Sequence, residues 1–498
     1  MRITNKMMTN NMMSNINKNK LSLNTLEQQY SSGKKIQRPS DDPIVTVRAL
    51  KLRTNLTELK QYYEKNIPDA MSWMNLTESA LNTVNEILRQ VNKYCGQGSS
   101  DTLTAKDRSA IVSNLEQMKQ QIYQEGNANY AGRYVFTGFK TDTPLLFTYD
   151  EPDLSYTITE KIDTANLQTV TKVSGSYKLA DFDDPTVDFS EVPKMSETYR
   201  IQLAYDNLDE NVPDSIRLYK KNDSGQLEEL APFLNLVVKS AADPDAYSPG
   251  DTVAHFIPET GEIILGKDVY EEIRKTDQIQ VTYSKTGFEK GSLRPEHYFD
   301  CTMTDNSKPE LEPVTYTKTK QEIQYEVNYN QRLTINTEGS DCITHQIGRC
   351  IDDILYAVND VIKTEEKIAE VEKRLTDVNL SDADKERYNK LKEQLETELT
   401  LKKEVMRKAF SNGIKISNQQ QDMVNTAVAD LGSRYVRLEL TENRLSSQKI
   451  DVEELLSENE DVDIVETVIK YQSAQTLYNA SLAAASQIVQ KSLLDYLR

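Results

Sequence analysis

Apolar residues near the C-terminus repeat at helical spacing. Their steps alternate between four and three residues, which is the spacing of a coiled-coil seam. We predict a seam through Ile464, Val468, Tyr471, Gln475, Tyr478, Leu482, Ala485 and Val489, with a second apolar line through Val465, Ala474, Leu477, Ile488 and Leu494. So much apolar surface on one helix needs a partner. The alternative is an ordinary amphipathic helix that packs on a globular core.

The other end of the chain offers such a partner. Its apolar residues step by three, four or seven positions, at Met12, Ile16, Leu23, Leu26 and Tyr30. We therefore expect the two termini to pair and to carry everything between them. Isolated helices are marginal in water, and ordering a backbone residue costs roughly 1–2 kcal/mol. We predict that residues 1 to about 40 and about 460 to 498 are largely unfolded in the monomer and become helical on assembly.

A loop follows the N-terminal helix. Residues 33–42 read GKKIQRPSDD, where glycine, proline and paired aspartates end one helix and cap the next. Asp42 is the predicted N-cap, with Pro43 at the first helical position, where a missing N–H is tolerated. This second helix runs toward Tyr94, and we expect a kink or a short break at Pro68.

The next segments alternate between helix and strand signals. Thr104 and Asp107 form a predicted capping box for a helix that ends near Gly126, and residues 133–138 form a strand and turn. Residues 141–340 hold most of the prolines and many short alternating runs, for example at 199–205, 278–283 and 324–329. That pattern predicts one β-rich domain or two small ones.

Helical spacing returns at about residue 341. Ser381 and Asp384 cap one further helix, and Gly413 marks an expected break before another. The predicted fold is mainly α, with long terminal coiled-coil helices, a helical bundle and an inserted β-rich domain. We assign residues 1–42 and 461–498 to a terminal coiled-coil assembly domain, 43–140 and 341–460 to a helical core, and 141–340 to an outer β-rich domain.

Composition supports an extended helical protein. Only 38% of the 498 residues are hydrophobic, while 28% are charged, which is typical of long helical bundles. The net charge of −19 argues against nucleic acid as a partner. Residues 141–340 carry 37 acidic against 19 basic side chains, so nearly the whole excess lies in the middle. An acidic, solvated outer domain on a more apolar stem follows from this.

The termini carry no predicted membrane signal. No segment is apolar enough to span a bilayer, so we expect no membrane insertion. Residues 1–20 are rich in methionine and asparagine and lack the apolar core of a cleaved secretory signal. Taken alone this favours a cytoplasmic protein, but it also permits export by a route that reads no such signal.

Candidate chemistry is sparse. The four cysteines are too few for a disulfide framework, and Cys342 and Cys350 lie roughly 12 Å apart along one predicted helix. His297 and Cys301 have the gap of a ligand pair, but no second pair completes a zinc site. We predict free thiols, no catalytic residue, no cofactor and no metal. The 26 tyrosines favour interfaces and strand faces over a pocket.

Several motifs, in order along the chain, resemble the flagellin superfamily. They are the start MRITNKMMTNN, the loop GKKIQRPSDDP, the segment GRYVFTGFKTDTPLLF at 132–147 and the end SLLDYLR. The residues that carry the resemblance are Gly33, Pro39, Ser40, Asp41, Asp42, Pro43, Tyr134, Phe136, Gly138, Leu494 and Asp495. It covers about residues 1–147 and 415–498. Within the superfamily, the Arg38–Pro43 loop, the 134–147 segment and Asp495 resemble the branch at the hook–filament junction more than flagellin itself.

The resemblance implies a non-enzymatic structural protein of the bacterial flagellum. Its expected partners are further copies of itself, the other hook-associated junction protein, flagellin, and an export chaperone at the C-terminal helix. It implies an extracellular place at the hook–filament junction, reached by type III export without signal cleavage. Two alternatives stay open: flagellin, or a coiled-coil stalk that displays an adhesin or glycan-binding module.

Overall fold

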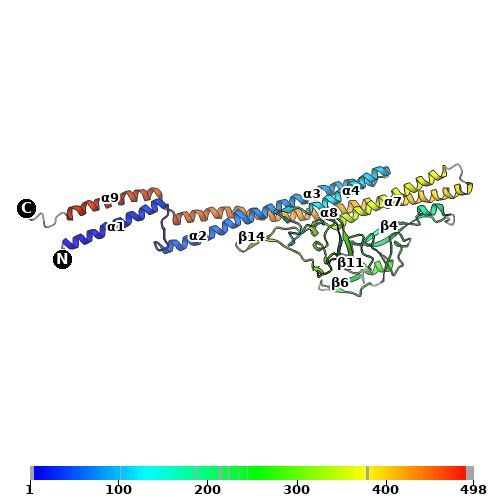
Figure 1. Cartoon of the computed structure of the whole chain (residues 1–498), viewed down its shortest axis with the longest axis horizontal. Helices are drawn as coiled ribbons and strands as arrows, with labels where there is room; N and C mark the ends of the chain where they lie inside the picture. The colour runs from blue at the N-terminus through cyan, green and yellow to red at the C-terminus, as the bar shows by residue number, and fades with distance from the viewer. Residues whose placement is uncertain are drawn as a thin grey trace, which may run out of the picture. The chain divides into compact units, whose positions relative to one another are not determined.

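The computed structural model describes residues 5–489, apart from 101–102, 185–186, 188, 212–215, 223–224, 234, 244 and 377–380. The chain forms two compact units. The first comprises residues 1–71, 325–333 and 436–498, and the second comprises 72–324 and 334–435. The predicted fold class is confirmed, because the terminal helices α1 and α9 pack together (Figure 1) and the sequence between them contains an inserted β-rich region of several sheets. The three-part division predicted above stays a prediction.

Long helices dominate both ends of the chain. The helices of the described residues are α1 (Asn5–Ser32), α2 (Pro43–Gln61), α3 (Ile67–Gly98), α4 (Ala105–Glu125), the short α5 (Lys267–Ile273) and α6 (Gly339–Cys342), α7 (His345–Leu375), α8 (Asp382–Glu460) and α9 (Ile464–Val489). Short 3-10 turns cover Thr164–Asn166, Leu179–Asp183 and Pro295–His297. The helix α5 was not predicted from the sequence.

The predicted helix caps are confirmed. The Asp42 carboxylate accepts hydrogen bonds from the backbone N–H groups of Ile44 and Val45 at 3.0 and 3.1 Å, and Pro43 is the first residue of α2. Thr104 and Asp107 form the capping box of α4. These local side-chain bonds satisfy N–H groups that have no partner inside the helix, so the start of a helix is readable from sequence.

The interruption predicted at Pro68 is present as a π-helical turn. Residues Tyr62–Asn66 form this turn between α2 and α3, and the Ile67 N–H donates to the carbonyl of Tyr62. Proline lacks an N–H and its ring crowds the carbonyl four residues earlier. The wider turn just before Pro68 accommodates both effects while the helix continues.

The break predicted at Gly413 is wrong, because α8 continues through it. A Cβ at Gly413 would lie 2.8 Å from Ile354 Cδ1 and 2.9 Å from Cys95 Sγ. The glycine therefore permits close packing of α8 against α3 and α7. Gly98 has a similar role: a Cβ there would lie 2.4 Å from the Phe410 ring.

The predicted β-rich middle contains two principal sheets, besides the hairpins β1–β2 and β14–β15. The five-stranded sheet has the order β4-β5-β10-β9-β8, and the six-stranded sheet has the order β13-β12-β3-β11-β6-β7. The strands are β1 (Asn129–Tyr130), β2 (Arg133–Tyr134), β3 (Glu151–Asp163), β4 (Gln168–Ser174), β5 (Lys194–Gln202), β6 (Ile216–Lys221), β7 (Leu227–Glu229), β8 (Leu236–Val238), β9 (Ala254–Ile257), β10 (Glu262–Leu265), β11 (Gln278–Phe288), β12 (Asp300–Asp305), β13 (Val314–Tyr316), β14 (Gln324–Asn328) and β15 (Gln331–Thr334). Within the two principal sheets, neighbouring strands are antiparallel except β8 and β9.

The two principal sheets share one hydrophobic core. Alternate residues of β3 and β11 are buried, among them Ile158 and Val281, and they pack with Ile201 of β5, Phe256 of β9 and Ile263 of β10. The alternation follows from the two-residue period of a strand, which sends successive side chains to opposite faces. This core fixes the position of the five-stranded sheet, in which β4 is an edge strand.

Within the second unit, α3 and α8 run antiparallel and are joined by two asparagine pairs. Asn85 Nδ2 donates to Asn425 Oδ1 at 2.8 Å, and Asn92 Nδ2 donates to Asn418 Oδ1 at 2.6 Å. Each pair is one heptad from the other on both helices. Polar pairs at such positions fix the register of packed helices at some loss of stability.

We expect Asn425→Leu to lower the free energy of unfolding by about 1–3 kcal/mol, because it leaves the buried Asn85 amide without a partner. The double variant Asn85→Leu/Asn425→Leu should recover most of that loss, since neither polar group remains. Urea unfolding followed by the fluorescence of Trp73, the one tryptophan of the chain, measures both. Asn82→Leu, at an exposed position of α3, is the control. Equal losses in the single and double variants would contradict this role.

Candidate functional site

The termini pair within the first unit, as predicted. α1 and α9 run antiparallel: Tyr30 stacks on Tyr471 with ring centroids 6.4 Å apart, and Asn19 Nδ2 donates to Ser481 Oγ at 2.7 Å. On α1, Ile16 is buried and Met12, Leu23 and Leu26 are half-buried, so these four predicted positions do face α9. Tyr30 remains 52% exposed, with one ring face on Tyr471.

The seam on α9 follows the predicted line only in part, because its phase is rotated. Its half-buried residues are Val468, Tyr471, Ala474, Tyr478, Ser481 and Ala485, of which Val468, Tyr471, Tyr478 and Ala485 were predicted. Gln475 and Leu482, which were predicted in the seam, are exposed, and so is Ile464. Thr467, which was not predicted in the seam, is buried beside the half-buried Val468. The side chains of Val489, Leu494 and Asp495 lie outside the described residues.

The polar pair Asn19–Ser481 explains this phase. Apolar residues occupy nearly every face of α9, so helical spacing alone fits more than one line. The hydrogen bond between Asn19 and Ser481 brings that face of α9 onto α1 and turns Leu482 outward. Asn19 lies three residues after Ile16 and four before Leu23, which is a seam position of a heptad repeat. Because asparagine is polar, a pattern of apolar residues alone does not include it.

The pairing leaves a large apolar surface uncovered on α9. Val465 is 70% exposed, Ile469 59% and Leu477 60%. Three methionines of α1 are also exposed, namely Met7, Met8 and Met13. Contiguous exposed apolar side chains of this kind mark surfaces that bind other chains.

Where α1 ends and α9 begins, a group of residues that we call the clasp joins the two chain segments: Lys34, Lys35, Arg53, Glu460 and Asp461. Lys34 and Asp461 form an antiparallel bridge. The Lys35 N–H donates to the Glu460 carbonyl at 2.6 Å, and the Val462 N–H donates to the Gly33 carbonyl at 3.0 Å. The α1–α2 loop is therefore hydrogen-bonded to the α8–α9 connection.

Ion pairs reinforce the clasp. The Glu460 side chain is only 4% exposed and lies 2.7 Å from Arg53 and 3.4 Å from Lys34. Lys34 also bonds Asp461, which raises the pKa of Lys34 and, with a second bond from Ser457, lowers the pKa of Asp461. Arg53 and Glu460 were not predicted as site residues, because nothing in the local sequence distinguishes them from solvated charges.

The predicted loop motif shapes one side of the clasp. Gly33 has φ of +69°, which favours glycine, and this turn ends α1. The Asp41 carboxylate accepts from the backbone N–H groups of Gln37 and Arg38 at 3.2 and 2.9 Å, while Asp42 caps α2. Pro39, Ser40 and Pro43 are exposed. The motif thus sets the turn between α1 and α2.

The second predicted motif belongs to the second unit and is not part of the clasp. Phe136 is buried, Tyr134 is half-buried in β2, and Gly138 has φ of +62°. A Cβ at Gly138 would lie 2.3 Å from Gln321 Oε1, the same atom that accepts from the Phe139 N–H. This motif is a packed turn.

The chemistry-bearing residues are buried as structural groups. His297 Nε2 lies 3.2 Å from the Pro144 carbonyl oxygen, and burial lowers the pKa of His297 to about 4. Cys95, Cys301, Cys342 and Cys350 are free and buried, and burial raises the pKa of each thiol. In the described part of the chain, no three His, Cys, Asp or Glu side chains are placed to hold a metal ion.

Both ends of the chain match family models. Residues 3–141 match the bacterial flagellin N-terminal helical region, and residues 414–497 match the bacterial flagellin C-terminal helical region. Both terminal regions of the chain are therefore similar to the helical regions of bacterial flagellin. The matched regions contain α1, α9 and every residue of the clasp.

Curated relatives cover parts of this chain. It is 27% identical over 176 residues to flagellar hook-associated protein 3 of Salmonella typhimurium, covering 34% of this chain and 54% of that one. It is 28% identical to the protein of that name from Escherichia coli, covering 29% and 45%, and 32% identical to a flagellin of Clostridium tyrobutyricum, covering 25% and 33%. The chain thus spans about half the length, or less, of the curated relatives it matches.

Solved structures of hook-associated proteins are also similar at a distance. One is a putative flagellar hook-associated protein from Vibrio parahaemolyticus, with a TM-score of 0.36, 12% identity, and 84% of this chain and 100% of that chain covered. Another is Xanthomonas campestris FlgL, with a TM-score of 0.31, 11% identity, and 82% and 99% covered.

Among the helices in the described ranges, none combines the length and the apolar character needed to cross a membrane.

Proposed function

We propose that this chain is a structural subunit of the bacterial flagellum that assembles at the junction between hook and filament. The observation that carries the proposal is the antiparallel α1–α9 pair, which lies in the matched flagellin regions and still exposes Val465, Ile469 and Leu477. A lone subunit has nothing to cover these side chains, whereas neighbouring copies in a ring do.

Two observations favour the junction over the filament. The first two curated relatives named above are both called hook-associated protein 3. The loop Arg38–Pro43 carries the sequence RPSDDP, which was read above as the junction pattern. The flagellin of Clostridium tyrobutyricum supports the filament as the second candidate, because its aligned part is more identical to this chain.

The partners follow from this position. Copies of this chain pack side by side through the outer faces of α1 and α9. The other hook-associated junction protein lies on the hook side and flagellin on the filament side. An export chaperone binds the C-terminal helix and covers its apolar surface before assembly. The subunit leaves the cell by the flagellar type III route and works outside it.

Microscopy of isolated flagella tests the proposal. An epitope placed in the exposed, acidic β-rich region should give one gold-labelled band where hook meets filament. Labelling along the whole filament would instead make this chain a flagellin, and absence from flagella would reject both functions. A strain that lacks the chain should secrete flagellin without building attached filaments.

A further inference from the structure

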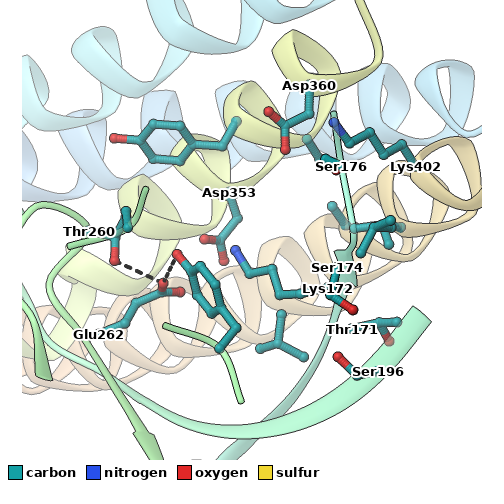
Figure 2. Close-up of a pocket in the computed structure, with 18 of the residues that line it drawn as sticks. Thr171, Lys172, Ser174, Ser176, Ser196, Thr260, Glu262, Asp353, Asp360 and Lys402 are labelled. Atoms are coloured by element: carbon teal, nitrogen blue, oxygen red, sulfur yellow. Dashed lines mark hydrogen bonds between the residues drawn. The ribbon is translucent and has the colours of Figure 1, made fainter. Parts of the chain in front are cut away.

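The second unit contains a large cavity that the proposed function does not use. It has a volume of about 1060 Å³ and is lined by edge strand β4, the 241–248 loop, α7 and α8. In Figure 2, Lys172 and Ser174 of β4 lie on one side and Asp353 and Asp360 of α7 on another, with Lys402 of α8 beside them. Cavities of this size hold small-molecule ligands in other proteins.

The lining is polar but close to neutral. Eight lysine or arginine side chains and seven aspartate or glutamate side chains contribute to it, in a chain whose net charge is −19. Seven serine or threonine hydroxyls and three tyrosines add further donors and acceptors. Such a surface offers many hydrogen bonds without selecting a net charge.

A buried ion network holds this lining in place. The Arg200 guanidinium bonds Glu262 and Asp353, and its Nε donates to Gln168 Oε1 at 2.9 Å. Glu262 also accepts a hydrogen bond from Thr260 Oγ1 at 2.9 Å, drawn as a dashed line in Figure 2, and one from the Tyr247 hydroxyl at 3.3 Å. Both carboxylates are therefore held by groups of the protein, and both also attract the nearby Lys172 ammonium.

Lys172 is placed differently. Its ammonium lies 4.4 Å from the centre of the Tyr247 ring, and it makes no hydrogen bond or ion pair with another described residue. Burial lowers the pKa of Lys172, but nearby Glu262 and Tyr247 more than offset this, so the ammonium stays charged. Its three N–H donors face the cavity with their hydrogen-bonding capacity unused.

We propose that this cavity is a binding site for a neutral oligosaccharide, with Lys172 as a donor to sugar hydroxyls and Tyr247 as an aromatic contact. A saccharide carries many hydroxyl groups and no net charge, which matches the lining. Its C–H faces pack on tyrosine rings, and its hydroxyls bond serine, threonine and charged side chains. The site lies in the β-rich region, outside the parts matched to flagellin, so the inference does not depend on the junction function.

Other ligand classes fit less well. Phosphates and other anions select a surplus of uncompensated cations, but Arg200 is saturated by Glu262, Asp353 and Gln168. The charge of Lys172 is likewise offset by the nearby carboxylates of Glu262 and Asp353. A divalent cation needs a cluster of free carboxylates, and the described residues contain no group of three potential ligands. A lipid chain would leave the charged groups that line this cavity without partners.

Saturation-transfer NMR on the full chain tests this, with maltotriose and chitotriose as neutral probes and inorganic phosphate as the anionic probe. We expect saturable binding of at least one trisaccharide in the millimolar range or tighter. Lys172→Met should weaken that binding roughly tenfold, since a charged hydrogen-bond donor is lost. Lys220→Met, at an exposed lysine of β6 outside the cavity, is the matched control.

Tyr247→Leu should abolish the sugar signal, and Tyr149→Leu, at a 75% exposed tyrosine, should not. Unchanged thermal unfolding of Lys172→Met confirms that its effect on binding is direct. The proposal is overturned if neither trisaccharide binds, which would leave a solvent-filled crevice. It is equally overturned if phosphate alone binds, or if Lys172→Met and Lys220→Met bind sugar alike.

Discussion

Replacing Glu160 with glutamine should remove a loss of stability that the second unit undergoes as pH rises from about 4.5 to about 7. Glu160 lies in β3, is 9% exposed, and accepts hydrogen bonds from the Ala204 N–H at 3.1 Å and the Tyr283 hydroxyl at 3.0 Å. Burial raises its pKa from 4.5 to about 7, although those two bonds and the charge of Arg349 oppose the shift. The carboxyl is therefore held in its protonated form well above its usual range.

The sign follows from proton binding. Between these two pKa values the folded chain keeps the Glu160 proton while the unfolded chain has released it, so each rise in pH favours unfolding. At about 1.4 kcal/mol for each pKa unit, the whole shift corresponds to roughly 3 kcal/mol. That stability is fully present below pH 4.5 and is lost once the pH has passed 7. Glutamine keeps an acceptor and never ionises, so Glu160→Gln should be more stable by about this amount at pH 8.

Urea unfolding at several pH values between 4 and 8.5, followed by Trp73 fluorescence, measures the difference. Trp73 is buried in α3 within the same unit. Glu197→Gln replaces an exposed glutamate of β5 and controls for the loss of one charge. Parallel pH profiles for Glu160→Gln and the unchanged protein would show that Glu160 is ionised in the folded state.

Local signals predicted the fold best. Asp42, Thr104 and Ser381 were assigned as caps from their own sequence neighbourhood, and each of these side chains accepts a hydrogen bond from a backbone N–H near the start of its helix. Proline disturbs a helix through its own ring and its missing N–H, so the interruption at Pro68 was also predicted correctly. Such features need no knowledge of distant residues.

Features that depend on distant partners were missed. Gly413 was read as a break, yet its role comes from Cys95 and Ile354, which lie far away in the sequence. Strand β3 pairs with β11 and β12, more than a hundred residues later, and alternation alone does not choose these neighbours. The burial of Arg200 and Glu160 was missed for the same reason. Charged residues are usually exposed, and nothing in the local sequence shows that distant sheets and helices enclose these two.

The assembly site shows both behaviours. The pairing of the termini follows from apolar spacing, because only helices with long apolar lines need each other. The face that α9 turns toward α1 does not follow from apolar spacing, because it is set by the hydrogen bond between Asn19 and Ser481 across the pair. The clasp could not be predicted from the sequence, because the burial of the Glu460 carboxylate depends on Lys34 and Arg53, which are distant in the sequence.

Aspartates at Val465 and Ile469 should abolish incorporation into the flagellum while leaving the monomer folded. Both residues lie on the face of α9 that points away from the half-buried seam, at 70% and 59% exposure. In the proposed ring this face packs on neighbouring copies, and an unpaired charge buried there costs far more than the packing supplies. In the monomer the same aspartates stay in water, and the one at Val465, the second residue of α9, also interacts favourably with the helix dipole.

Leu311→Asp/Val314→Asp is the matched control. These residues are comparably exposed apolar side chains, at 57% and 43%, but they lie in the β-rich region, which carries no flagellin match. We expect the control to enter flagella normally, the Val465/Ile469 variant to be exported but not incorporated, and both to unfold at unchanged temperature by circular dichroism, which reports on the helices of both units. Normal incorporation of the α9 variant would remove this face from the assembly interface.

Amide exchange on the verified monomer completes the test. If the paired helices order only when neighbours cover their outer faces, residues 470–486 should exchange rapidly in the monomer and slowly in assembled flagella. The α1–α9 seam has a half-buried polar pair at its centre and one buried isoleucine on α1, so it offers little burial to offset the ordering of both helices. Strong protection of residues 470–486 in the monomer would mean that the pair is stable alone, and that assembly joins preformed helices.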